Sequence, residues 1–277
     1  MGKIILLNTP IGNLGDLTPR VMEALKNGSL FAVEDTRVFK ELLGHLGISL
    51  QGKRVMAFHE HSETGQVDKL IEMAEREDLH VTSDAGSPII SDPAYPLVSR
   101  AAAVGVKIES YSGVSSPIMA LELSGLPPIP FHFHGFLPRE TSKKARIFSD
   151  MTVGTHIFFE APTRVEDTLD ELALIMPGLK VAVVRELSKK FEQVMRFKAS
   201  DWPQLKADMT YKGEFVVLIH QPEGKSAMGS ELQELAQEMI TKGATPKQLS
   251  KLLGLILDRP TKDIYSLLNR QKDQVEE

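Results

Sequence analysis

The stretch IILLNTPIGNLGDLTPR, residues 4–20, joins a short apolar run to a loop rich in glycine, proline and asparagine. The apolar run predicts a buried strand, and Thr18-Pro19 is the pattern of a helix N-cap followed by proline at the first helical position. A strand, a polar loop and a helix form the usual frame of a phosphate-binding turn. Gly12 and Gly15 do not fit G-x-G-x-x-G, however, and no Lys-Ser or Lys-Thr follows as in a P-loop. The stretch therefore predicts an α/β unit whose loop holds something other than a dinucleotide or a triphosphate.

Short apolar runs alternate with longer helical patterns along the first 113 residues. A β-α-β-α series of this kind predicts a mainly parallel sheet with helices on its faces. The strands are expected at residues 4–7, 30–33, 55–58, 80–82 and 107–110, with helices near residues 19–26, 40–45, 66–75 and 96–104.

A second alternating series follows, and then the strand pattern stops. The sequence predicts two α/β domains, residues 1–113 and 114–223, with a flexible linker and a helical extension over residues 230–277. In the second domain, strands are expected at residues 131–134, 155–160, 180–185, 194–197 and 214–220, with helices at residues 115–123, 143–150, 164–175 and 203–208.

The composition limits the classes of protein that this chain can belong to. It has 277 residues, 42% of them apolar and 25% charged, as in soluble globular proteins. The absence of cysteine excludes disulfides, thiolate nucleophiles and cysteine-ligated metal sites. The first apolar run is too short for a signal peptide, and no segment approaches the roughly 20 apolar residues of a membrane span. These features predict a cytoplasmic protein with no membrane contact.

The formal charge of -5 argues against a basic coat for nucleic acid, but the charge is uneven. Residues 180–198 and residues 242–272 each carry a surplus of lysine and arginine, so a polyanion would meet a patch. The alternative is that these runs are solvated faces. The basic helices of the extension fit either a helix-turn-helix or a bundle for dimer contacts, with an apolar stripe of Leu249, Leu252, Leu253 and Ile256.

Polar clusters follow the second and third expected strands. Residues 34–37, Glu-Asp-Thr-Arg, suggest a site, although a helix N-cap at Asp35 with an ion-paired Arg37 is the alternative. His59-Glu60-His61 follows the third strand. A zinc site there is not favoured, because no further ligands appear at helical spacing.

The fourth and fifth strands lead into loops that suit a small polar ligand. SDAGSPIISDP, residues 83–93, is long for a plain connection and offers backbone amides and carbonyls. In YSGVSSP, residues 111–117, Gly113 would let the backbone approach a ligand. Ser115 and Ser116 begin a helix, where free amides attract negative charge, and N-capping by Ser115 is compatible with this role.

The second half of the chain carries charged residues near its strand ends. Glu160, Arg164, Arg185, Glu186 and Lys189 are candidates for one cleft between the two halves, and surface ion pairs are the alternative. No Ser-His-Asp order is evident, nor a carboxylate pair of the glycosidase kind.

These motifs together carry a resemblance. TPIGNL, AVEDTR, LLGHLGI, FHEH, TSDAGSPIISDP, GFLP, FFEAPTR, VRELSK and KGEFVVLI occur in this order along the chain. The sequence resembles the ribosomal small subunit methyltransferase I family of the tetrapyrrole methylase (class III methyltransferase) superfamily. The resemblance spans about residues 3–222, and the tail resembles the family's helical extension. Ser112-Gly113-Val114 and residues 159–164, Phe-Glu-Ala-Pro-Thr-Arg, depart from the family's usual residues.

The resemblance implies an enzyme that uses S-adenosylmethionine to methylate the ribose 2′-hydroxyl of a cytidine in 16S rRNA, expected at cytidine 1402. The small ribosomal subunit would be its partner, a homodimer its assembly, and no metal would be needed. A sulfonium nucleoside has no phosphates, which would explain why the loop after the first strand lacks a pyrophosphate motif.

The resemblance also implies roles for individual residues. In the catalytic role we expect Asp35 or Glu160 as the base, followed by His59. RNA phosphates would be held by Arg37, Arg164, Arg185 and Lys189. The cofactor would contact Pro10, Ile11, Gly12 and Asn13 on the cleft floor, Asp84, Ala85, Gly86 and Ser87 at its methionine part, Ser115 and Ser116 near its carboxylate, and Phe136 and Leu137 with residues 214–217 at its adenine.

Three other functions stay open at this point. A tetrapyrrole C-methyltransferase is suggested by Gly-Val-Ser-Ser at residues 113–116, although the basic run and the helical tail count against it. A Rossmann dehydrogenase lacks its glycine fingerprint here. The third is a non-enzymatic RNA-binding module with a vestigial cofactor pocket.

Overall fold

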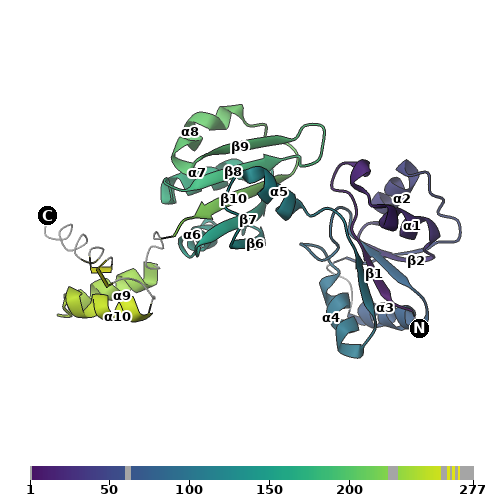
Figure 1. Cartoon of the computed structure of the whole chain (residues 1–277), viewed down its shortest axis with the longest axis horizontal. Helices are drawn as coiled ribbons and strands as arrows, with labels where there is room; N and C mark the ends of the chain where they lie inside the picture. The colour runs from purple at the N-terminus through teal and green to yellow at the C-terminus, as the bar shows by residue number, and fades with distance from the viewer. Residues whose placement is uncertain are drawn as a thin grey trace.

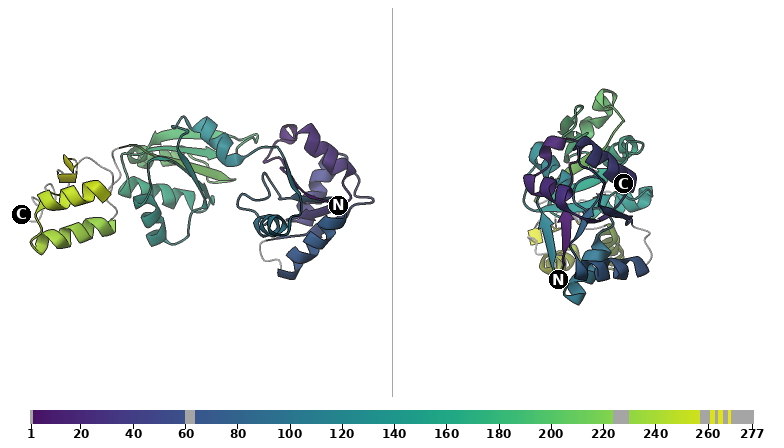
Figure 2. Two further views of the ribbon diagram at one scale, coloured as in Figure 1. Left: turned by 60° about the horizontal axis from the view of Figure 1, so that its bottom comes forward. Right: turned by 90° about the vertical axis from the view of Figure 1, so that its right-hand side faces the viewer.

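The computed structural model describes residues 2–59, 64–223 and 230–256, together with positions 261, 262, 264, 265 and 268. Two sheet-containing units and a small helical unit follow one another in a row, with the N-terminus in the first unit (Figure 1). Figure 2 shows the same row from another side on the left and looks along its length on the right.

The first unit holds a parallel five-stranded sheet, as the sequence predicts. Its strands lie in the order β3-β2-β4-β1-β5, and every neighbouring pair is parallel. All five carboxyl ends therefore meet at one edge, where ligands of open α/β sheets bind. The strands are β1 (Ile4–Leu7), β2 (Leu30–Val33), β3 (Arg54–Ala57), β4 (Leu79–Thr82) and β5 (Ile108–Tyr111).

Strand β1 is apolar throughout because both of its faces are covered. Ile5 and Leu7 pack in the cluster that includes side chains of α1 (Pro19–Asn27) and α2 (Thr36–His45). Ile4 and Leu6 pack on the opposite side, with side chains of α3 (Thr64–Arg76) and α4 (Tyr95–Val104).

The N-termini of α1 and α2 are set by capping side chains. Thr18 accepts a hydrogen bond from the Val21 N–H, which confirms the predicted start of α1. Helix α2 starts earlier than expected, at Thr36 rather than near residue 40, because the Asp35 carboxylate caps it by accepting from the Arg37 N–H at 2.7 Å. The polar run at residues 34–37 is thus largely a helix start and not a free loop.

The second unit holds a mixed sheet in the order β6-β7-β10-β8-β9. Only β6 and β7 are parallel; β10 runs antiparallel to β7 and β8, and β9 runs antiparallel to β8. The short link over residues 186–192 cannot make a parallel crossover, so β8 and β9 form an antiparallel pair. The strands are β6 (Phe131–Phe136), β7 (Gly154–Glu160), β8 (Lys180–Arg185), β9 (Gln193–Lys198) and β10 (Phe215–Gln221).

Helices cover both faces of this second sheet. One face packs against α6 (Thr141–Ser149), α7 (Val165–Ile175) and α8 (Trp202–Leu205), and the core there includes Phe148, Leu169 and Trp202. The other face packs against α5 (Ser116–Ser124) through Ala120 and Leu121. Ile11, from the loop after β1, belongs to this same cluster, so the first unit contributes a side chain to the core of the second.

The helical unit contains α9 (Ser230–Thr241) and α10 (Pro246–Ile256). Ala236, Leu249 and Leu253 form a small core with Ile264 and Leu268. Leu252 is 51% exposed, so the predicted stripe on α10 is wrong at this position. The side chain of Ile256 and most of the linker lie outside the described residues. Among the described helices, none is both long and apolar enough to cross a membrane.

Candidate active site

A cavity of about 410 Å³ lies where the two sheet units meet. In the first unit it is lined by residues that follow β1, β2, β4 and β5, all at the carboxyl edge of the parallel sheet. In the second unit the cavity is lined by residues at the end of β7, just after β8 and at the start of β10. These positions lie at one edge of the sheet, because β10 runs antiparallel to β7 and to β8.

The loops after β1 and β4 are tied together by backbone hydrogen bonds. Thr9 and Gly86 form an isolated antiparallel bridge, with N···O distances of 2.9 and 3.0 Å. Gly86 has a φ of +80°, and a Cβ there would lie 3.3 Å from Ile11 Cγ2. This position therefore needs glycine, and the bridge gives the cavity a firm floor.

Three carboxylates from the first unit line one side of the cavity: Glu34, Asp84 and Asp92. The Asp84 N–H donates to Glu34 Oε2 at 3.1 Å, and the Asp35 N–H donates to Asp84 Oδ1 at 3.1 Å. Partial burial and the charge of Glu34 raise the pKa of Asp84. Burial, with Glu34 and Asp84 beside it, raises the pKa of Asp92 to about 7. This acidic wall favours a cationic ligand and repels a phosphate.

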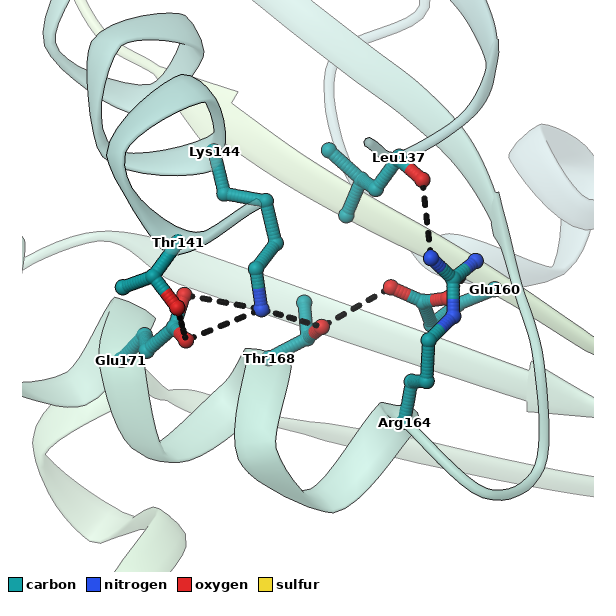
Figure 3. A network of polar contacts seen from close by, with 7 residues as sticks. All are labelled: Leu137, Thr141, Lys144, Glu160, Arg164, Thr168 and Glu171. Atoms are coloured by element: carbon teal, nitrogen blue, oxygen red, sulfur yellow. Dashed lines mark hydrogen bonds and ion pairs between the residues drawn. The ribbon is translucent and has the colours of Figure 1, made fainter. Parts of the chain in front are cut away.

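Glu160, at the end of β7, lines the opposite side and is held by several donors. Its side chain is 0% exposed and accepts from the Ala161 N–H at 2.8 Å and the Thr168 hydroxyl at 2.8 Å. Arg164 pairs with it at 2.5 Å and also donates to the carbonyl of Leu137 at 3.1 Å (Figure 3).

The same network continues away from the cavity to α6. Lys144, with a side chain only 6% exposed, lies 2.9 Å from Glu171 and donates to the Thr168 hydroxyl at 3.5 Å (Figure 3). Thr141 donates to Glu171 at 3.2 Å. Thr168 thus joins the partly buried Lys144–Glu171 pair to Glu160, so α6 and α7 both fix the carboxylate at the cavity wall.

Comparison with known proteins places the chain in a family. Residues 3–203 match the model of the "Tetrapyrrole (Corrin/Porphyrin) Methylases". A relative from Halalkalibacterium halodurans named "Ribosomal RNA small subunit methyltransferase I" is 33% identical over 98% of this chain and 96% of its own length. A relative of the same name from Xylella fastidiosa is 36% identical over 95% of this chain and 98% of its own length. The chain belongs to the ribosomal RNA small subunit methyltransferase I family of the tetrapyrrole methylases.

A solved structure of another methyltransferase has a similar fold. The uroporphyrin-III C-methyltransferase from Thermus thermophilus, in complex with S-adenosylhomocysteine, has a TM-score of 0.51 and covers 79% of this chain and 98% of its own. At 16% sequence identity, the likeness concerns the fold alone.

Most residues predicted to hold the cofactor of this family do line the cavity. They come from four separate loops or strand ends, which the fold brings together. Residues 213–216, at and before the start of β10, line it too, where the sequence placed the adenine. The predicted residues in the lining are Ile11, Asp84, Ala85, Gly86, Ser87, Ser115, Ser116 and Phe136.

Pro10, Gly12, Asn13 and Leu137 do not belong to the cavity lining. Asn13 instead caps the 3-10 helix η1 (Leu14–Asp16), because its side chain accepts from the Gly15 N–H. Leu137 is 3% exposed within the core of the second sheet.

Gly12 lies against the second unit. A Cβ on this glycine would come within 2.3 Å of Lys189 Cγ, so its part in the cleft is to let the two units approach each other. Pro10 is half-buried beside it.

Of the predicted catalytic residues, only Glu160 lines the cavity. The Asp35 carboxylate caps α2 and pairs with Arg37 at 2.6 Å. Hydrogen bonds from the Arg37 side chain and backbone lower the pKa of Asp35 to about 2, which makes it a weak base. His59 follows β3, the edge strand of the first sheet, outside the lining.

All four residues predicted to hold RNA phosphates make contacts within the protein, and among the side chains that the structure describes Arg37 does so with Asp35 alone. Arg164 pairs with Glu160 as described above. Arg185 donates to the carbonyls of Lys212 and Phe191, and Lys189 lies 3.1 and 3.0 Å from Glu186 and Glu214.

Arg37 differs from these three, since its side chain is 85% exposed beside Asp35. The basic run at residues 180–198 therefore does not form a single free patch. Arg196, also in that run, donates to the carbonyl of Leu123.

Sequence reasoning missed several residues of the cavity. Glu34 was quoted only as part of a polar run, and Asp92 only as part of a rigid loop, yet both carboxylates line the site. The apolar lining residues Phe159 and Leu187 also went unassigned. The signal that could have found Glu34 was its place directly after β2, at the ligand edge of the sheet.

Gly113 corrects another expectation. The sequence suggested that it admits a ligand, but a Cβ there would lie 2.5 Å from Asn8 Cβ, and Gly113 is not part of the lining. Asn8 in turn donates to the carbonyl of Tyr111 at 2.6 Å. This glycine therefore allows the chain after β5 to pack on the loop after β1.

The part of the chain that the structure describes contains no group of three or more histidine, aspartate or glutamate side chains placed to hold a metal ion. Glu60 and His61 of the His-x-His motif lie outside the described residues.

Proposed function

We propose that this protein transfers the methyl group of S-adenosylmethionine to the ribose 2′-hydroxyl of a cytidine in 16S rRNA, with cytidine 1402 as the target. The observation that carries the proposal is the cavity between the two sheet units, which is lined by the acidic wall of the first unit and by apolar residues of the second. The relatives from Halalkalibacterium halodurans and Xylella fastidiosa carry the name of an rRNA methyltransferase, which supports the substrate class.

The residues of the cavity fit this methyl donor. The donor is cationic at its sulfonium and ammonium groups, and Glu34, Asp84 and Asp92 supply opposite charge. It has no phosphate, so a glycine-rich pyrophosphate turn would serve no purpose. The Thermus thermophilus neighbour binds S-adenosylhomocysteine in the same fold, which agrees with this choice of donor.

The rest of the donor also finds suitable partners. Phe159, Leu187 and Val216 offer apolar surface for an adenine ring. Ser115 stands at the N-cap of α5 without a side-chain capping bond, so its hydroxyl is left for a ligand. With Ser116 it presents a helix N-terminus, which suits the donor carboxylate.

The donor supplies an activated methyl group bound to a sulfonium. Once the methyl group is transferred, the rest of the donor is a neutral thioether. The task of the protein is to hold the 2′-hydroxyl in line with that methyl, to exclude water, and to accept the hydroxyl proton. Alignment alone can lower the barrier by about 7–11 kcal/mol. A well-placed base adds roughly 10²–10⁴-fold.

For the RNA, we propose that Arg37 contacts a phosphate, since its guanidinium is 85% exposed near the acidic wall. The other three predicted residues would not contact the RNA themselves. Through their contacts within the protein they would hold in place the rim of the cleft on which the nucleotide lies: Arg164, Arg185 and Lys189. This assignment agrees with their contacts to Glu160, to backbone carbonyls, and to Glu186 and Glu214.

We also propose that the protein works in the cytoplasm as a homodimer. Its substrate is made there, and a chain without cysteine suits a reducing compartment. Ile129 and Leu174 are 85% and 84% exposed and offer apolar contact area. The helical unit could serve the dimer or the RNA, and both roles stay predictions.

The experiment is mass spectrometry of 16S rRNA from cells with and without the gene. Loss of one cytidine 2′-O-methyl group, restored by the wild-type gene, is the expected result. Ala85→Trp, which fills the cavity, should fail to restore it, whereas Ala103→Trp on the exposed side of α4 should succeed.

The purified protein separates the alternatives. It should transfer labelled methyl to small-subunit rRNA and not to uroporphyrinogen. Transfer to uroporphyrinogen alone would support the tetrapyrrole methyltransferase instead. Unchanged rRNA in the deletion strain would overturn the proposal.

A further inference from the structure

The proposed reaction needs a group that accepts the proton of the 2′-hydroxyl, and that group must reach the cavity. The cavity lining contains five carboxyl side chains, Glu34, Asp84, Asp92, Glu160 and Glu214. Asp35 and His59, which the sequence suggested, lie outside the lining. The choice is therefore among these five.

Four of them accept a hydrogen bond or pair with a cation, and Glu34 does so from the Asp84 N–H. Glu160 accepts from a backbone N–H, a hydroxyl and Arg164. Glu214 pairs with Lys189 at 3.0 Å, and Asp84 accepts from the Asp35 N–H. Each of these carboxylates therefore already serves a donor or a cation within the protein.

Asp92 has the opposite surroundings. Its carboxyl group lines the cavity beside that of Glu34, with Ser83 next to it. Within the described residues no ion pair joins it to a lysine or an arginine. Two neighbouring carboxyl groups in a partly buried site disfavour each other's charge. The raised pKa of Asp92, about 7, agrees with this geometry and suits a base that works near neutral pH.

The loop that carries Asp92 is fixed at both ends. The Ala94 N–H donates to the carbonyl of Pro88 at 3.0 Å, and α4 begins at Tyr95. Ser91 adopts a φ of +65°, and its Oγ lies 3.5 Å from the place where a Cβ on Gly135 would stand, so this loop faces β6 of the second unit. Asp92 is thus held at the joint between the two units, where donor and RNA would meet.

From this geometry, and resting on the function proposed above, we propose that Asp92 is the general base of the methyl transfer and that Glu34 positions its carboxylate. A lone pair of the 2′-oxygen forms the bond to the methyl carbon while the carbon–sulfur bond breaks and its electron pair stays on sulfur. The hydroxyl proton passes to the Asp92 carboxylate, which then releases it to water.

The charged groups around Asp92 set the expected pH dependence. On its own side of the cavity these are Glu34 and Asp84, with the Asp35–Arg37 pair behind them. Across the cavity lie Glu160 and Glu214, each paired with a cation. The near neighbours are negative and unpaired with lysine or arginine, so removing the Glu34 charge should make Asp92 more acidic.

The test compares three variants of the full-length protein: Asp92→Asn, Glu34→Gln and, as a matched control, Asp78→Asn. Asp78 is exposed and precedes β4, at the sheet edge opposite the cavity. Each variant is assayed for donor affinity by calorimetry and for kcat on small-subunit rRNA from pH 5.5 to pH 9. The carboxyl groups are also titrated by NMR in protein labelled with ¹³C-aspartate, without donor or RNA.

The wild type should show a kcat that rises as pH increases through about 7, and one aspartate carboxyl titrating in that range. Asp92→Asn should lower kcat by roughly 10²–10⁴-fold, remove that NMR titration, and keep the donor affinity within about fivefold. Glu34→Gln should move both inflections to lower pH. Asp78→Asn should match the wild type.

Two results would overturn the proposal, and they are distinct. If the wild type methylates rRNA and Asp92→Asn does so at a similar rate with the same pH profile, Asp92 is not the base although the proposed function holds. If the wild type methylates no rRNA, the proposed function fails, and the role of Asp92 fails with it.

Discussion

Gly86 occupies a backbone conformation that other residues adopt only with strain, at the point where the cavity floor is tied together. Its φ is +80°, and its N–H and carbonyl both bond to Thr9. We expect Gly86→Ala to destabilise the protein by about 1–2 kcal/mol. It should also weaken donor binding by roughly tenfold, because the new methyl presses on Ile11. Thermal denaturation and calorimetry measure the two effects.

Gly105→Ala is the matched control for this prediction. Gly105 has a nearly equal φ of +79° at the end of α4, but nothing lies within 4 Å of the position of its Cβ. The control should lose similar stability and keep its donor affinity. Equal donor affinity in both variants would mean that the Thr9–Gly86 bridge does not shape the site.

Asp92 should also leave a signature in stability. Its pKa is raised to about 7 from the ordinary aspartate value of 3.8, so the folded state binds more protons than the unfolded state between those pH values. Its contribution to stability is therefore full below about pH 4 and is lost as pH rises through about 7. Asp92→Asn should melt a few degrees above the wild type at pH 8, and this gain should shrink at pH 5. The gain will be modest because the site is partly open to solvent.

Differential scanning calorimetry at pH 5 and pH 8 measures this effect. The control variant Asp78→Asn should show the same melting temperature as the wild type at both pH values. A variant that melts below the wild type at pH 8 would mean that the Asp92 charge stabilises the fold and does not strain it.

At the scale of elements, α6 and α7 are joined to the end of β7 by one hydroxyl. Thr168 is 0% exposed, donates to Glu160 and accepts from Lys144 (Figure 3). Thr168→Val keeps the shape and removes both bonds, so buried charged groups lose a partner. We expect a loss of about 1–3 kcal/mol in the free energy of unfolding, and a lower kcat because Glu160 and Arg164 lose their fixed place.

Thr141→Val is a suitable control for the network. Thr141 donates to Glu171 from an exposed position, so its loss should cost well under 1 kcal/mol. Denaturant unfolding measures both variants. Equal stability of Thr168→Val and wild type would show that the network does not bind these elements together.

The helices and strands themselves were largely predictable, because the spacing of apolar residues and the positions of capping and turn residues are local properties of the sequence. The run at residues 4–7 and the Thr18-Pro19 pair determine β1 and the start of α1 without help from distant residues. The direction of β8, β9 and β10 was not predictable from their patterns. Strand direction depends on which strands pair. Strand β10 lies between β7 and β8 in the sheet, although it follows both of them by many residues in the sequence.

The site was only partly predictable for a related reason. Strand ends indicated Asp84, Ser115 and Glu160, since a parallel sheet collects its loops at one edge. Sequence could not distinguish Asp35 from Asp92. The Asp35 carboxylate caps its own helix and pairs with Arg37, whereas Asp92 lines the cavity, and the short sequence pattern around each residue does not show this difference.

At the scale of the whole molecule, particular side chains join the two sheet units. The Ser188 hydroxyl donates to Asp16 Oδ2 at 2.5 Å, and Gly12 lies against the Lys189 side chain. We expect Gly12→Ala to displace Lys189 and weaken donor binding about three- to tenfold, because the cavity needs both units in register. Donor calorimetry measures the effect.

Gly44→Ala provides the control, since this glycine lies within α2 with nothing within 4 Å of its Cβ position. That variant should be slightly more stable than the wild type and should bind the donor normally. Normal donor binding by Gly12→Ala would mean that the joint between the units tolerates displacement.

The central claim is that the space between the two sheet units is built for a cationic, phosphate-free methyl donor. A crystal structure of the protein with S-adenosylhomocysteine tests it most directly. The account predicts density for the ligand between residues 84–87 and residues 213–216, with Asp92 beside the sulfur and the adenine against Val216. Density at another place, or a cavity left vacant at saturating ligand, would contradict it.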